Sequence, residues 1–350
     1  MKILLFIMTL FSLSITTVYA ISASSYVVID QNSNRVLYGS NYNDQSLIAS
    51  ITKILTAIVV IENCDIDEVI VVGEEVLSAY GSAVYIEVGE EISVRDLLYG
   101  LMLRSGNDAA IVLAHHVSGS IEEFAILMNE LVDSLGLKNS IFYNPSGLDE
   151  ETENLSTAYD MAVITSYAMK NEDYFLITST DYHTTKTNYK TYWWDNKNRL
   201  LGTNEYTTGG KTGYTEKAKR TLVTTASYNN MDIVVVTLND GNDFEDHASL
   251  YNTVFSNYES IKVVDKDLTS YVDSDNKYYV NNDYYALIKE EDSDNLIVKT
   301  DFFTSPVGNV GGLIKVYYTD DLLYEDNLYI EEKEVKISFW EKIVGWLKLW

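Results

Sequence analysis

The sequence predicts an α+β domain followed by a small all-β domain. Within the first 260 residues, strand-like runs stand at both ends and stretches of helical periodicity lie between them. Strands placed in this way commonly share one sheet, with the intervening helices packed against it. After about residue 260, short Val, Tyr and Ile runs alternate with Asp and Asn clusters, which is typical of short strands joined by turns.

The larger domain begins and ends with predicted hairpins. Apolar runs at 26–29 and 36–38 flank a polar Asn-Ser-Asn turn, and β-rich runs at 221–227 and 233–238 are joined by Asn-Asn-Met-Asp. We therefore expect the first and last strands to be neighbours in one sheet. Apolar periodicity between the hairpins predicts helices over about 50–62, 97–117, 121–135 and 158–169.

The two ends of the chain predict export and attachment to a membrane. Residues 1–20 have one Lys, an apolar stretch and Val-Tyr-Ala at the cleavage position, as a signal peptide does; a retained anchor is the alternative. Residues 335–350 sort into an apolar and a polar helical face and carry three Lys, one Glu and three of the five Trp. This pattern favours an amphipathic helix in a membrane interface over a helix packed on the protein itself.

These signals divide the chain into four segments. We expect a signal peptide at 1–20, the α+β domain at 21–260, the β-rich domain at 261–334 and the membrane-anchoring helix at 335–350. The protein would then work at the outer face of a cytoplasmic membrane.

Composition excludes several classes of partner. The chain has 25 Lys and Arg against 52 Asp and Glu, so the net charge of −27 argues against binding to nucleic acid. Cys64 is the single cysteine and cannot form a disulfide within the chain; we expect it to be a small buried apolar residue. The adjacent His115 and His116 point about 100° apart on a helix. We therefore predict no metal and no cofactor.

The chain contains three motifs that could carry catalytic chemistry, and the first is Ser50-Ile51-Thr52-Lys53. Residues three apart lie on one helix face, so the Ser50 hydroxyl and the Lys53 amine can meet. A serine needs a base to become a nucleophile, and a lysine desolvated among apolar neighbours can be neutral enough to act as one. The motif alone is common, and an ordinary helix start with an exposed lysine also explains it.

The other two motifs follow further along the chain. Ser105 and Asn107, separated by one glycine, lie in a polar break between Leu103 and the helical run that begins near Ala109. Their side chains can point into one cleft, although a helix cap also explains them. Lys211 and Thr212 supply a cation and a hydroxyl for a substrate carboxylate, and Gly213 leaves room for substrate beside the strand. Ser50 to Ser105 is 55 residues and Ser105 to Lys211 is 106, and the three motifs occur in a suitable structural order.

With these motifs the sequence resembles the penicillin-binding proteins and serine β-lactamases. It is most similar to the low-molecular-mass D-alanyl-D-alanine carboxypeptidases, peptidase family S11, over roughly residues 25–260. The resemblance implies a catalytic domain of the β-lactamase and transpeptidase type, an antiparallel sheet with helices on both faces. The segments that carry it are ASITKILTAIVVIE (49–62), LMLRSGNDAAIVLA (101–114), FYNPSGL (142–148), STAYDMA (156–162) and GGKTGYTEKAKRTLV (209–223).

The resemblance also implies residue roles. Ser50 would be the nucleophile, Lys53 its base and Ser105 the proton relay, while the backbone N–H groups of Ser50 and Tyr214 would bind the oxyanion. The substrate would be held by Asn107, Lys211, Thr212 and Gly213. It would be a peptidoglycan stem peptide, and β-lactams would be covalent inhibitors.

Three positions depart from the family pattern. Ile48 stands where the family usually has Pro, Asn154 where His is common, and Lys219 where Gly follows Ala in the third motif. None of them removes the nucleophile or its base, but Lys219 can alter the strand edge beside the substrate.

Two other functions remain open from the sequence. A class A β-lactamase needs a Glu for its deacylating water in an E-x-x-L-N order, which the loop 150–155 does not have. A non-catalytic wall-associated scaffold of the same fold would have no reason to keep all of the motif side chains. We therefore expect a serine-type carboxypeptidase.

Overall fold

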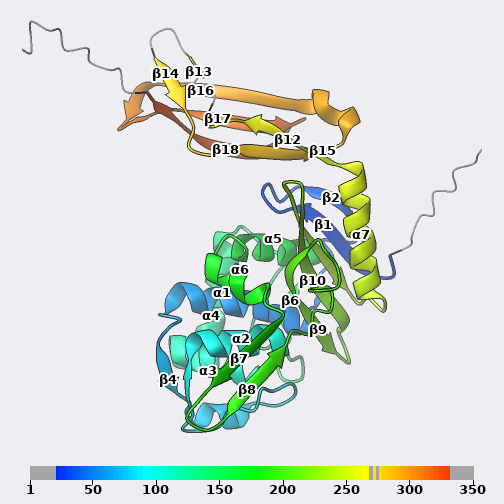
Figure 1. Cartoon of the computed structure of the whole chain (residues 1–350), viewed down its shortest axis with the longest axis vertical. Coiled ribbons are helices and arrows are strands. Elements are labelled where there is room, and N and C mark those ends of the chain that lie inside the picture. Colours follow the sequence, from blue (N-terminus) through cyan, green and yellow to red (C-terminus); the bar gives the residue numbers. More distant parts are fainter. Residues whose placement is uncertain (1–20, 268–270, 273–275, 332–350) are drawn as a thin grey trace, which may run out of the picture.

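The computed structural model describes residues 21–267, 271–272 and 276–331 of the chain (Figure 1). The predicted signal peptide (1–20) and the predicted amphipathic helix (335–350) lie outside the described residues.

An antiparallel sheet of five strands forms the centre of the larger domain, in the order β2-β1-β11-β10-β9. The first and last predicted hairpins therefore meet, as expected, and Val27 of β1 lies opposite Val236 of β11. These strands are β1 (Ser25–Asp30), β2 (Val36–Ser40), β9 (Thr207–Thr215), β10 (Lys219–Tyr228) and β11 (Met231–Leu238).

Helices cover both faces of this sheet, which confirms the predicted fold class. Side chains alternate along a strand, so Val234 and Val236 pack into the large helical core while Ile233 and Val235 pack under α7 on the other face. Figure 1 shows α7 against one side of the sheet and the other helices on the opposite side. They are α1 (Lys53–Asn63), α2 (Val94–Arg104), α3 (Asn107–Ser118), α4 (Ile121–Ser134), α5 (Ala158–Ala168), α6 (Glu172–Thr178) and α7 (Asp243–Asn257).

The predicted helical stretch over 97–117 is two helices, and they are separated at the predicted polar break. Ser105 takes a left-handed backbone conformation, with φ of 64°, and this ends α2 before α3 begins at Asn107. Helices α6 and α7 were not predicted. The sequence of α7 is rich in polar residues, and its apolar side becomes recognisable only where the helix packs on the sheet. Short elements complete the domain: β3 (Ser46–Leu47), β4 (Val69–Val71), β5 (Glu91–Ser93), β6 (Leu155–Ser156), β7 (Tyr182–Lys186), β8 (Thr191–Asp195) and the 3₁₀ turns Ala49–Thr52 and Glu74–Ser78.

The C-terminal part is all β and has its own core, in which Val264, Ala286, Ile314 and Leu328 are fully buried. It starts at Glu259, directly after α7, and combines a two-stranded and a five-stranded sheet. Its strands are β12 (Glu259–Val264), β13 (Tyr271–Val272), β14 (Lys277–Tyr279), β15 (Tyr284–Ile288), β16 (Leu296–Val307), β17 (Val310–Tyr318) and β18 (Asp321–Ile330), with a 3₁₀ turn at Glu290–Asn295.

Among the described residues, no single helix has the length and apolar character needed to cross a membrane. One bent pair, α3 with α4, meets that test of length and composition when both helices are taken together, and an angle of 83° separates them.

Candidate active site

Ser50 lies in a 3₁₀ turn immediately before α1. The preceding residue, Ala49, has a left-handed backbone with φ of 50°, a conformation that is uncommon for a residue with a side chain. Gly147 packs directly against this turn, because a Cβ at position 147 would collide with the Ala49 carbonyl group. The turn places the Ser50 side chain in the wall of a cavity of about 340 Å³.

Lys53, the first residue of α1, is fully buried beside Ser50. Its Nζ lies 3.1 Å from the Ser50 Oγ. Burial lowers the pKa of Lys53 to about 7; the nearby Lys197 contributes in the same direction and Asp108 opposes it. A substantial fraction of the amine is therefore neutral near pH 7 and able to accept a proton.

Two further contacts orient the Lys53 amine. Its Nζ donates to the Asn107 Oδ1 at 2.7 Å and to the backbone carbonyl of Ser146. A neutral amine has two N–H groups and one lone pair. With both N–H groups engaged on these two acceptors, the lone pair is free to face the Ser50 hydroxyl.

Asn107 has a second contact that sequence reasoning did not foresee. Its Nδ2 donates to the backbone carbonyl of Tyr80 at 2.7 Å, and the residue is only 2% exposed. The amide therefore links Lys53 to the segment around Tyr80. Binding of a substrate amide by Asn107, the predicted role, stays a prediction; the observed contacts make it a positioning residue for Lys53.

Ser105 lines the cavity and is paired with Lys211, a buried residue of β9 that is not among the lining residues. The left-handed turn at Ser105 directs its hydroxyl toward β9, where the Lys211 Nζ donates to it at 3.0 Å. Burial lowers the pKa of Lys211 well below its ordinary range, and the charges of Lys53 and Lys197 add to this effect. An anionic group entering the cavity would have the opposite effect and favour the charged form of Lys211.

Strand β9 is an edge of the main sheet and passes close to Ser50. A Cβ at Gly213 would lie 3.0 Å from the backbone nitrogen of Ser50 and would also collide with the Thr221 hydroxyl. The close approach therefore requires glycine. Thr212 and Tyr214 line the same cavity as Ser50, and an edge strand offers backbone groups to an extended ligand.

The cavity is positively charged although the chain as a whole is acidic. Lys197, Arg199 and Arg220 line it, with Asp243 as the one acidic side chain among its lining residues. None of these four residues was predicted, because they come from the segment before β9, from β10 and from the start of α7. Only the fold brings them together.

Arg220 is held in place by two contacts. Its guanidinium forms hydrogen bonds to both oxygens of the Asp243 carboxylate, at 2.6 and 3.1 Å, and lies over the Phe244 ring at 5.6 Å. Arg199 lies over the same ring at 4.6 Å. Because one carboxylate balances only part of this positive charge, the cavity is suited to an anionic ligand.

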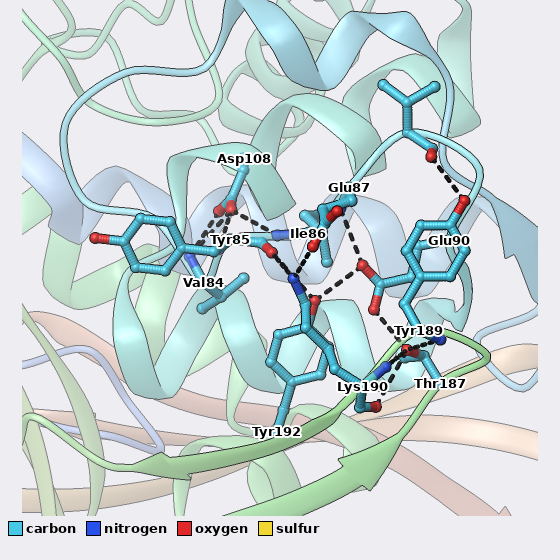
Figure 2. Close-up of polar contacts among 11 residues, drawn as sticks. Val84, Tyr85, Ile86, Glu87, Glu90, Asp108, Thr187, Tyr189, Lys190 and Tyr192 are labelled. Atoms are coloured by element: carbon cyan, nitrogen blue, oxygen red, sulfur yellow. Dashed lines mark hydrogen bonds and ion pairs between the residues drawn. The ribbon is translucent and has the colours of Figure 1, made fainter.

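The loop formed by residues 80–90 lies beside the cavity and is fixed by the carboxylate of Asp108, the residue after Asn107 on α3. It accepts hydrogen bonds from the backbone N–H groups of Val84, Tyr85 and Ile86, at 3.0, 2.7 and 3.3 Å (Figure 2). The same loop contributes Ser82 to the cavity wall. The segment that contacts Asn107 therefore has a defined position.

The other end of this loop is tied to the β7–β8 hairpin. The fully buried carboxylate of Glu90 accepts hydrogen bonds from the hydroxyl groups of Thr187 and Tyr192, at 2.6 and 2.9 Å. Figure 2 shows these contacts next to the ion pair between Lys190 and Glu87, whose atoms lie 2.6 Å apart. The hairpin thus supports the loop, and it also reaches Tyr85, whose carbonyl group accepts a hydrogen bond from the Tyr192 hydroxyl at 3.3 Å.

Comparison with known proteins identifies the family. Residues 13–242 match the peptidase family S11, described as D-alanyl-D-alanine carboxypeptidase. The chain belongs to this family. It is 37% identical over 255 residues to the D-alanyl-D-alanine carboxypeptidase DacF of Bacillus subtilis, a match that covers 70% of this chain and 65% of the relative. A match to DacA of Haemophilus influenzae is 32% identical and covers 70% and 65%. The matched region thus spans slightly less than two thirds of these relatives.

Solved structures agree with this assignment. Penicillin-binding protein 5 of Haemophilus influenzae superimposes with a TM-score of 0.75 at 26% identity, covering 90% of this chain and 98% of that one. A D-alanyl-D-alanine carboxypeptidase of Mycobacterium tuberculosis gives a TM-score of 0.65 at 29% identity, covering 68% and 92%. The match to penicillin-binding protein 5 therefore extends beyond the larger domain.

Two departures from the family pattern have consequences that the structure shows. Asn154 is buried; its Oδ1 accepts from the N–H of Tyr143 at 2.8 Å and its Nδ2 donates to the Asn144 carbonyl at 2.8 Å. It thereby braces the loop that presents Ser146 to Lys53. Lys219 has φ of 60°, a conformation that favours glycine, so a lysine there introduces local backbone strain at the start of β10.

Proposed function

We propose that this chain is a serine-type D-Ala-D-Ala carboxypeptidase that removes the terminal D-alanine from peptidoglycan stem peptides. The observation that carries the proposal is the contact between Ser50 and the buried Lys53, whose amine is oriented by Asn107 and the Ser146 carbonyl. A hydroxyl beside a desolvated, oriented amine has the arrangement of an activated nucleophile. The family and the printed names of its relatives supply the substrate class.

Acylation would begin with attack by the Ser50 Oγ on the carbonyl carbon of the penultimate D-alanine. The hydroxyl proton passes to the Lys53 Nζ as the Oγ–C bond forms. The negative oxygen is stabilised by the backbone N–H groups of Ser50 and Tyr214. The C–N bond then breaks, and Ser105 gives a proton to the leaving amine of D-alanine. Ser105 takes a proton in return from Lys211, whose Nζ lies 3.0 Å from the Ser105 Oγ.

Deacylation would follow by attack of water on the Ser50 ester. One proton of the water passes through Ser105 to the amine of Lys211, and the Lys53 ammonium returns to the Ser50 oxygen the proton that it took during acylation. The C–O bond breaks, and the shortened peptide leaves as a carboxylic acid that ionises in solvent. During acylation Lys211 and Thr212 would hold the carboxylate of the terminal D-alanine, or that of a β-lactam, and Arg220 and Arg199 add positive charge to the same cavity. A β-lactam would acylate Ser50 in the same way and block it.

Mass spectrometry of the full chain provides the test. The chain is incubated separately with a stem pentapeptide and with penicillin. We expect loss of one alanine from the peptide, a stable penicilloyl adduct on Ser50, and neither result for Ser50→Ala. Ser82→Ala is the matched control, since Ser82 also lines the cavity but has no proposed role in the reaction.

The other functions left open by the sequence give different results. Rapid turnover of penicillin without a lasting adduct would indicate a β-lactamase. Absence of both peptide cleavage and an adduct, in folded protein, would indicate a scaffold and overturn the proposal.

We further propose that the protein is exported and anchored at the outer face of the cytoplasmic membrane. The support is the sequence of residues 1–20 and 335–350, in particular the Trp and Lys content of the second segment. Deleting 335–350 should release the protein from membranes while penicillin labelling of Ser50 is kept. Unchanged retention on membranes would contradict the anchor.

A further inference from the structure

A group of three potential metal ligands lies at the opposite end of α1 from Lys53. Cys64 is the C-cap of α1, Glu68 lies in the turn before β4, and His116 is in the last turn of α3. The Cys64 Sγ, a Glu68 carboxylate oxygen and a His116 ring nitrogen all lie within 4.8 Å of one another. The Nε2 of His116 and the Oε1 of Glu68 are 2.7 Å apart.

The electrostatic environment of this group favours a cation. The C-terminal ends of α1 and α3 meet here, and each carries the partial negative charge of a helix C-terminus. The carboxylates of Glu68 and Asp65 also act electrostatically on the Cys64 sulfur. A bound cation would offset their negative charge.

The three side chains are also accessible to an ion from solvent. The His116 side chain is 23% exposed and that of Glu68 is 41% exposed, while Cys64 is half-buried. The sequence predicted that Cys64 is a small buried apolar residue. In the structure it is only half-buried, and the fold brings two potential metal ligands to it from other segments of the chain.

We propose that Cys64, Glu68 and His116 form a binding site for a single Zn²⁺ ion. Zinc prefers this combination of thiolate, imidazole and carboxylate ligands, and three protein ligands leave one tetrahedral position for water. On binding, the Cys64 thiol releases its proton to solvent, and the contact between His116 and Glu68 is replaced by bonds from each to the ion. The thiolate and the carboxylate then balance the two charges of the metal.

The site would stabilise the domain without entering the reaction. Lys53 and Cys64 are eleven residues apart on α1, which corresponds to about 16 Å along a helix. The ion would join the C-terminal ends of α1 and α3, the two helices whose N-terminal ends carry Lys53 and Asn107. It would thereby fix the relative position of the elements that hold the general base.

Binding of metal to the full chain, purified in detergent and freed of metal with a chelator, tests the site. We expect one Zn²⁺ per chain, and with Co²⁺ as the probe an absorption band from thiolate-to-metal charge transfer. Zinc at about a hundredfold excess over its dissociation constant should raise the thermal midpoint by about 5 °C. Penicillin labelling with and without zinc shows that the chain is folded in each sample.

Matched variants decide which side chains are responsible. Cys64→Ser and His116→Gln should weaken zinc binding by more than about 100-fold, since loss of a partner outside the ligand set already costs 10–100-fold. His115→Gln is the control, because the neighbouring histidine has a similar burial but is not in the group. The proposal is overturned if the unmodified chain binds no zinc at micromolar concentration, if Cys64→Ser binds it normally, or if His115→Gln loses it as His116→Gln does.

Discussion

Replacing Asn107 with Asp tests whether Lys53 acts as the base in acylation. The Asn107 Oδ1 lies 2.7 Å from the Lys53 Nζ, so the substitution places a carboxylate next to the amine with little change in shape. A negative charge at this distance stabilises the ammonium form. Asn107→Asp should therefore raise the pKa of Lys53 and move the appearance of the neutral base to higher pH.

The expected effect is large at neutral pH. With a pKa of about 7, roughly half of the Lys53 amine is neutral at pH 7. An opposite charge within hydrogen-bonding distance shifts a pKa by about 1–3 units, and a shift of about 2 units leaves about 1% of the amine neutral. Acylation at pH 7 should then be about 50-fold slower than in the unmodified chain, and the rate should recover as the pH approaches about 9.

We would measure the rate of labelling by a fluorescent penicillin from pH 6 to pH 10. The pH at which the rate reaches half of its maximum gives the midpoint of the pH–rate profile. Asn107→Leu is the matched control. It also loses the contact with the Tyr80 carbonyl but introduces no charge, so its rate can fall without an alkaline shift of the midpoint. The reasoning is refuted if Asn107→Asp has the same midpoint as the unmodified chain, or if Asn107→Leu shifts it equally toward alkaline pH.

Three other substitutions have defined outcomes. Gly213→Ala should slow penicillin labelling by about 100-fold, because the added Cβ would displace β9 from the Ser50 turn. Gly241→Ala is the control and should label normally, since a Cβ at position 241 meets no atom within 4 Å. Arg199→Gln should lower kcat/KM for an anionic pentapeptide by about fivefold, equivalent to about 1 kcal/mol. The effect should become smaller at high salt, and an effect independent of salt would contradict a role of Arg199 in attracting the substrate's charge. Burial lowers the pKa of His247 to about 3, so below its ordinary pKa of 6.5 the unfolded chain takes up a proton that the folded chain does not. Stability is therefore lost as the pH falls from about 6.5 toward 3, by about 2 kcal/mol at pH 5 from this group, and urea unfolding should show that His247→Gln lacks this part of the acid sensitivity.

Parts of the main sheet and of the active site can be predicted from local sequence patterns. The apolar runs at 26–29 and 233–238 predict strands, and β1 and β11 are neighbours in the structure. The three-residue spacing of Ser50 and Lys53 predicts their contact, because it depends only on the geometry of one turn. The prediction of this contact succeeds because Ser50 and Lys53 are close in sequence.

Other features depend on contacts between distant segments. The break between α2 and α3 was only partly predicted, since a left-handed residue at Ser105 is not specified by its side chain. The polar sequence of α7 conceals a helix whose apolar side is formed by residues such as Leu250 and Val254 against the sheet. In both cases the decisive contacts come from other elements.

The α+β class, the order of the three motifs and the pairing of Ser50 with Lys53 can be predicted from the amino-acid sequence, because each rests on local periodicity or on short spacing. Three other features become apparent only in the folded chain: the Asn107 amide orients Lys53, Arg199 and Arg220 make the cavity cationic, and His116 lies beside Cys64 and Glu68. One cause explains all three. Burial, electrostatic potential and metal-binding geometry depend on distances between segments that are far apart in the chain, and those distances exist only after folding.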